Sequence, residues 1–159
     1  MKAILAGILL WAMVQVVYAH PAEGVYWMLI DGDGKLQARV TEGELQVQVI
    51  AIKQDARDMR DEKNPKPDLR TRRILGMVVM QGFRWDATEQ HWHGGTIYDP
   101  TEGKTYDAFI WSDPKTGNLQ VRGYVMIGWF GRTETFERVT GSQPGKHQAG
   151  EPELVYLQR

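Results

Sequence analysis

The chain has 159 residues, of which 42% are hydrophobic and 25% charged, and its formal net charge is −1. This near-neutral balance argues against a nucleic-acid-binding protein, which needs a clearly basic face. The absence of cysteine excludes disulfides and thiol chemistry, so stability must come from packing and backbone hydrogen bonds.

The first 19 residues predict a cleaved secretory signal peptide. Lys2 supplies a positive start, residues 3–17 form an uncharged apolar run, and Val17-Tyr18-Ala19 fits a signal-peptidase site. The run is shorter than the roughly 20 residues that a bilayer span needs, and the alternative is a retained N-terminal anchor. We therefore expect an exported protein, periplasmic or extracellular, that begins at His20 and has no transmembrane segment after cleavage.

The next segments alternate between apolar and polar residues. Residues 24–30 form a β-rich apolar run that ends in the turn-forming sequence Asp31-Gly32-Asp33-Gly34. Residues 35–41 and 44–53 then alternate, with an apolar residue at every second position. A period of two indicates antiparallel strands that bury one face.

Residues 54–73 interrupt this alternation. Twelve of these twenty residues are charged, seven basic and five acidic, and Pro65 and Pro67 prevent a continuous helix. The basic residues could indicate an anionic partner, but the mixed signs favour a solvated excursion between strands. The half before Pro65 could form one short helix.

Strand patterns return after this charged excursion. Residues 74–85, 92–98, 104–111, 119–126 and 132–139 are predicted strands, and the tail, residues 140–159, could add a short edge strand at 153–158. Two turns share the pattern D-P-x-x-G, in which the aspartate bonds back to the turn backbone and the proline fixes φ near −65°. The glycine takes the left-handed conformation. The turn-forming residues are Asp99, Pro100, Gly103, Asp113, Pro114 and Gly117.

About eight short strands joined by short turns predict an all-β domain over residues 20–139. Such spacing is typical of an antiparallel up-and-down β-barrel or a sandwich. An eight-stranded barrel has an interior that is either filled by side chains or just wide enough for one small ligand.

Five blocks of sequence, in a fixed order, carry a family resemblance. They are Ile74-Leu75-Gly76-Met77, Trp92-His93-Gly94-Gly95-Thr96-Ile97-Tyr98-Asp99-Pro100, Gly103-Lys104-Thr105-Tyr106, Leu119-Gln120-Val121-Arg122-Gly123-Tyr124 and Gly131-Arg132-Thr133. Together they resemble an uncharacterised family of exported bacterial proteins, the domain of unknown function 2147 family, over roughly residues 24–139. The resemblance implies a lipocalin-like β-barrel that can hold an apolar ligand, and no established activity.

The chain departs from that family at two places. Members often carry a cysteine pair before the Ile-Leu-Gly strand, whereas residues 54–73 contain none. Phe136 stands where the family has a tryptophan ahead of a late arginine. Lipocalin-like barrels typically close by stacking such an arginine over an early aromatic ring, so we expect Arg138 and Trp27, with Tyr26 as the alternative ring, to form a structural latch. The contact would contribute on the order of 1–2 kcal/mol.

The function that we predict is the binding of a small apolar or amphipathic molecule. The inward alternating positions expected to line its cavity are Leu45, Val47, Val49, Tyr106, Ala108, Ile110, Val121 and Val125. The alternative is a structural or interaction module of the cell envelope with a filled barrel. Phe109 and Trp111 share a strand face with Asp107, so they form an exposed apolar patch if Asp107 points to solvent.

The sequence contains few features of an enzyme or of a metal site. It has no G-x-S-x-G elbow, no P-loop and no cysteine nucleophile, and we predict no catalytic residue and no cofactor. His91 and His93 share a strand face, and a mature N-terminal His20 could chelate copper through its amine and imidazole. Exposed histidines and a frayed terminus are the commoner arrangement, so no metal site is predicted.

Overall fold

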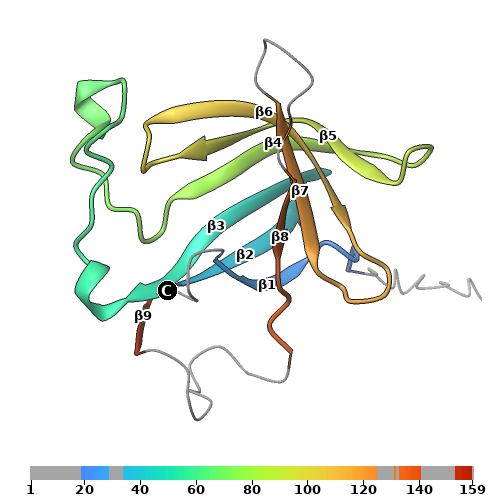
Figure 1. Cartoon of the computed structure of the whole chain (residues 1–159), viewed down its shortest axis with the longest axis horizontal. Helices are drawn as coiled ribbons and strands as arrows, with labels where there is room; N and C mark the ends of the chain where they lie inside the picture. The colour runs from blue at the N-terminus through green and yellow to red at the C-terminus, as the bar shows by residue number, and fades with distance from the viewer. Residues whose placement is uncertain (1–18, 29–33, 125–130, 132, 141–152, 159) are drawn as a thin grey trace, which may run out of the picture.

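One antiparallel sheet curls into a nearly closed barrel (Figure 1). The computed structural model describes residues 19–28, 34–124, 131, 133–140 and 153–158. The strands in this part of the chain are β1 (Gly24–Trp27), β2 (Gly34–Thr41), β3 (Glu44–Lys53), β4 (Val78–Asp86), β5 (His91–Asp99), β6 (Lys104–Ser112), β7 (Leu119–Tyr124), β8 (Thr133–Phe136) and β9 (Leu154–Tyr156). Among the described residues, no helix is long and apolar enough to cross a membrane.

The strands follow an up-and-down order, as predicted. Each strand from β1 to β7 pairs antiparallel with the next, and β9 pairs with β3. The residues after β8 return to β1, because the Trp27 N–H donates to the Glu137 carbonyl at 2.9 Å and the Val139 N–H donates to the Val25 carbonyl at 2.9 Å. The prediction of an all-β, lipocalin-like barrel is therefore confirmed.

Residues 74–77 form a turn rather than the start of a strand. The Met77 N–H donates to the Ile74 carbonyl at 3.0 Å, Gly76 has a φ of 90°, and β4 begins at Val78. The predicted tail strand forms as β9, which pairs with residues 51–53 of β3. Residues 29–30 and 125–126, the ends of two predicted strands, lie outside the described residues.

The two ends of the barrel differ in their connections. At one end, called here the closed end, lie the start of β1 and the short turns after β2, β4 and β6. At the opposite end, called the loop end, lie the long connection 54–77 and the turn between β5 and β6. Between them is a packed apolar core whose largest members without exposed surface are Tyr26, Leu45, Phe83, Ile110 and Leu119.

The two D-P-x-x-G turns have the geometry that their pattern predicts. The Asp99 carboxylate accepts the Thr101 N–H at 2.8 Å, and the Asp113 carboxylate accepts the Lys115 N–H at 2.8 Å. The closing glycines are left-handed, with φ of 69° at Gly103 and 71° at Gly117. These turns set the register of β5, β6 and β7.

Candidate functional site

Arg138 closes the barrel at the closed end. Its guanidinium donates to the Pro21 carbonyl at 2.9 Å and to the Glu23 carbonyl at 2.5 Å, and lies 5.6 Å from the centre of the Tyr26 ring. A β-carbon at Gly24 would lie only 2.8 Å from the guanidinium, so glycine makes room for it there. The predicted latch thus joins the end of β8 to the residues that precede β1.

The aromatic partner of this latch is Tyr26 and not Trp27. Successive residues of a strand point to opposite faces, and here Tyr26 points inward with no exposed surface. Trp27 faces the other way, with the Lys35 ammonium 4.4 Å from its ring centre. Burial raises the pKa of Tyr26, although Arg138 acts in the opposite direction, and the hydroxyl donates to the Ala22 carbonyl at 2.9 Å.

Most of the predicted cavity positions lie in the packed middle of the barrel. Each of the six has at most 4% of its surface exposed: Leu45, Val47, Val49, Ala108, Ile110 and Val121. Side chains rather than solvent therefore surround these positions. Val125 lies outside the described residues, and the remaining position, Tyr106, is different.

Two inward-facing side chains near the loop end are less buried than those of the barrel middle. Tyr106 and Ile97 are cross-strand partners that face inward with Met80, and both are only half-buried. Met28, two residues after the buried Tyr26, is also half-buried and packs against the core. The Tyr106 hydroxyl donates to the Glu102 carboxylate at 2.9 Å, which raises the pKa of Tyr106. The loop end therefore combines a partly open apolar lining with a polar rim.

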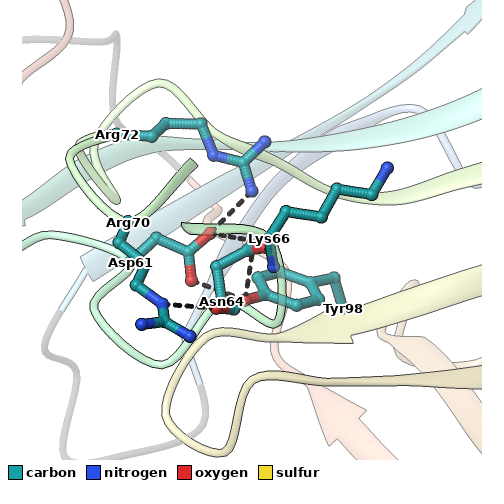
Figure 2. A network of polar contacts seen from close by, with 6 residues as sticks. All are labelled: Asp61, Asn64, Lys66, Arg70, Arg72 and Tyr98. Carbon is teal, nitrogen blue, oxygen red and sulfur yellow. Dashed lines mark hydrogen bonds and ion pairs between the residues drawn. The ribbon is translucent and has the colours of Figure 1, made fainter. Parts of the chain in front are cut away.

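A buried carboxylate holds the charged excursion in place beside this end (Figure 2). Asp61 has no exposed surface and accepts hydrogen bonds from Tyr98 at 2.5 Å, Asn64 at 2.7 Å and Arg72 at 2.7 Å. Burial by itself raises the pKa of Asp61, but these three donors outweigh it, so the pKa lies below its usual value. Asp61 is therefore an ionised anchor in a segment of mostly exposed charges.

The rest of this network fixes the loop around Asn64. The Asn64 side chain also donates to the Tyr98 hydroxyl at 3.1 Å, and the Asn64 backbone carbonyl accepts from Arg70 at 2.8 Å. Tyr98 belongs to β5, so the excursion is tied to the barrel wall. The sequence predicted that the side chains of residues 54–73 are exposed to solvent. This is correct for most of them and wrong for Asp61 and Asn64, which are buried. The proposed helix is only a 3₁₀ turn, Gln54–Ala56.

Five rings form a continuous cluster on the outer face of β5, β6 and β7. This outer aromatic cluster is centred on Phe109, and the ring centres around it lie 5.1–5.5 Å away. Its members are His91, His93, Phe109, Trp111 and Tyr124. Asp107 is exposed on the same face. Phe109 and Trp111 were expected to form an outer patch if Asp107 pointed to solvent, and it does.

The structure does not bring the three candidate metal-binding histidines together. His20 packs on the inward-facing side, with its ring 4.3 Å from Trp85 and 4.7 Å from Trp92, whereas His91 and His93 belong to the outer cluster. Within the described residues, no group of three or more histidine or acidic side chains could hold a metal ion. Burial lowers the pKa of His20 more than Glu23 raises it, and its neutral Nδ1 accepts the Ala22 N–H at 3.2 Å.

Comparison with known proteins places this geometry in context. The sequence model of a family described as "Uncharacterized protein conserved in bacteria (DUF2147)" matches residues 25–138. No curated protein shows a significant match. A similar solved structure is protein HP1028 from the human pathogen Helicobacter pylori, described as belonging to the lipocalin family, with 23% identity and a TM-score of 0.62 over 75% of this chain and 83% of that chain. At this identity the likeness shows the lipocalin-like fold alone.

Proposed function

We propose that this chain, which belongs to the DUF2147 family of uncharacterized bacterial proteins, binds a small apolar or amphipathic molecule at the loop end of its barrel. The observation that carries this proposal is that two inward-facing side chains near the loop end are only half-buried. Tyr26 and Leu45 have no exposed surface, whereas Ile97 and Tyr106 are half-buried. Lipocalin-like barrels can hold one small ligand inside the sheet, and we place that ligand beside these half-buried side chains.

The chemistry of the loop end favours an amphipathic ligand. Met28 and Ile97 offer apolar surface, and the Tyr106 hydroxyl and Glu102 carboxylate offer polar groups at the rim. Ligand sites typically combine an apolar lining with a few placed polar groups. An apolar chain would contact the lining, and its polar head would lie near Tyr106. Export to the periplasm or beyond, as the signal peptide predicts, would give the protein access to envelope and extracellular molecules of this kind.

Native mass spectrometry of the protein purified from its host is the direct test. A co-purifying mass of a few hundred daltons, released on denaturation, would identify the ligand. In parallel, a fluorescent amphipathic probe, 1-anilinonaphthalene-8-sulfonate, is titrated into the delipidated protein. Saturable binding with one site per chain is expected.

Two neighbouring substitutions on β5 show where the probe binds. Ile97→Lys places a charge on the inward lining, and we expect it to weaken probe binding at least tenfold. Thr96→Lys is the matched control, because Thr96 pairs with the exposed Asp107 on the outer face, and it should bind like the wild type. Equal binding by both variants, with both folded by circular dichroism, would show that the loop end is not the site.

The outer aromatic cluster favours a second candidate function, an interaction module of the cell envelope. Contiguous exposed apolar surface often marks a contact with another molecule, and Tyr124 is 43% exposed there. Phe109→Ser removes the central ring of the cluster. If a host protein co-purifies with the wild type and with Ile97→Lys but not with Phe109→Ser, this second function is favoured over ligand binding.

A further inference from the structure

Residues 20–23 form a tight plug over the closed end. The Glu23 N–H donates to the His20 carbonyl at 2.8 Å, and the His20 ring lies edge-on against Trp85 and Trp92. Ala22 has no exposed surface. Arg138 fixes the carbonyls of Pro21 and Glu23, as described above.

The Glu23 carboxylate joins this plug to the sheet and to the predicted cleavage point. One carboxylate oxygen accepts the Val40 N–H of β2 at 2.9 Å, and the other accepts the backbone N–H of His20 at 2.9 Å. That nitrogen is the atom that becomes the α-amine if the signal peptide is removed after Ala19. Ala19 itself is exposed, so the peptide bond before His20 lies at the edge of the folded barrel.

We propose that cleavage between Ala19 and His20 creates a structural N-terminus, in which the His20 α-ammonium pairs with the Glu23 carboxylate and completes the plug. Hydrolysis of this bond by a signal peptidase consumes one water, leaves a carboxylate on Ala19 and leaves the amine on His20. The reference pKa of an α-amine is about 7.7–8.0, so the amine carries a proton at neutral pH. In the precursor only the acceptor of this hydrogen bond is charged, whereas after cleavage the donor and the acceptor both carry a charge, which strengthens the contact.

This arrangement also assigns the two chelating atoms of His20 to internal contacts. The backbone nitrogen donates to Glu23, and Nδ1 accepts from Ala22. The histidine terminus therefore serves the closure of the barrel rather than a copper site. The proposal depends on export and is independent of ligand binding at the loop end.

The test uses the full chain, exported by its host and purified as the mature protein. Mass spectrometry first determines the N-terminal residue, which we expect to be His20. The α-amine is then acetylated selectively near pH 6.5, where lysine amines are protonated. An acetyl group occupies the place of the exposed Ala19, so it removes the charge without requiring new space.

Acetylation is carried out on the wild type and on Glu23→Gln, which retains the size of the side chain and removes its charge. We expect acetylation to lower the thermal midpoint of the wild type by about 2–4 °C and to leave that of Glu23→Gln nearly unchanged. A different N-terminal residue, no shift in the wild type, or equal shifts in both proteins would overturn the proposal. A large rise in the midpoint on adding one equivalent of copper would also overturn it, because the amine would then be a metal ligand.

Discussion

The two ends of the barrel are held by opposite kinds of polar contact. At the closed end one side chain, Arg138, donates to the backbone carbonyls of Pro21 and Glu23. At the loop end one carboxylate, Asp61, accepts from three side chains, and its main partner in the barrel wall is Tyr98. The first contact needs one particular residue, whereas the second needs four.

This difference determines how each end can fail. At the closed end the Arg138 side chain makes the contacts with both carbonyls, so these contacts are lost together if that residue changes. The loop-end network shares its hydrogen bonds among Asp61, Asn64, Arg72 and Tyr98, and Asn64 also bonds Tyr98 directly. Loss of one partner there leaves part of the network in place, so the largest single effect is expected at the closed end.

Replacing Arg138 with alanine should therefore have the largest effect. The change removes three hydrogen bonds from a charged donor and the contact with the Tyr26 ring, and we expect a loss of about 2–4 kcal/mol in the free energy of unfolding. Urea denaturation measures it. Arg138→Lys keeps the charge without the planar fork and should lie between alanine and wild type. An unchanged midpoint in Arg138→Ala would show that the latch idea is wrong.

Asp61→Asn should cost about 1–3 kcal/mol, because a neutral amide cannot accept all three donors. The effect should depend on pH in a defined direction. The pKa of Asp61 is lower in the folded protein than its ordinary 3.8, so ionisation stabilises the fold above pH 3.8. This contribution is lost as the pH falls through the folded pKa. Denaturation from pH 7 to pH 2 should show the difference between wild type and Asp61→Asn shrinking only below pH 3.8, and a constant difference would contradict the role of the carboxylate.

The strands could be predicted because their pattern is local, with an apolar residue at every second position from residue 35 to residue 41 and again from residue 45 to residue 51. The latch was expected from the likeness to lipocalin-like barrels, and that expectation named Trp27 first where the structure has Tyr26. Residues 25–30 are apolar on both strand faces, so the sequence does not decide between Tyr26 and Trp27. The turns, like the strands, could be predicted from a local pattern, because aspartate, proline and glycine act on their own backbone.

The buried network around Asp61 at the loop end could not be predicted in this way. Asp61 is one of five acidic residues among twelve charged ones, and nothing in its neighbours distinguishes it from Asp58. Its burial depends on Tyr98, 37 positions away on β5. A contact that is built from distant side chains leaves no periodic signal. The sequence also does not show that the middle of the barrel is filled. Alternation shows which side chains point inward and not how closely they pack.

The paired turns offer a comparison within one molecule. Gly103 and Gly117 close identical turns with nearly equal φ, so alanine should incur a similar left-handed strain of about 1–2 kcal/mol at both. A β-carbon at Gly103 would collide with the backbone carbonyl of Lys63, whereas at Gly117 it would meet only the flexible Arg138 side chain. Gly103→Ala should therefore be the less stable variant by about 1 kcal/mol or more, measured by urea denaturation. Equal stabilities would show that the excursion does not press on the turn.

The smallest effect should come from Asp58, three residues before Asp61 in the same excursion. Asp58 pairs with Arg57 at 3.2 Å and with Arg73 at 3.0 Å, but 59% of its side chain is exposed. Solvent and salt screen such pairs, so Asp58→Asn should change the free energy of unfolding by no more than about 0.5 kcal/mol. Urea denaturation of Asp58→Asn and Asp61→Asn side by side, at low and at 1 M salt, compares the two carboxylates. If Asp58→Asn costs as much as Asp61→Asn, the mixed charge of the whole segment holds the excursion, and the contrast between the two ends of the barrel no longer rests on one buried carboxylate.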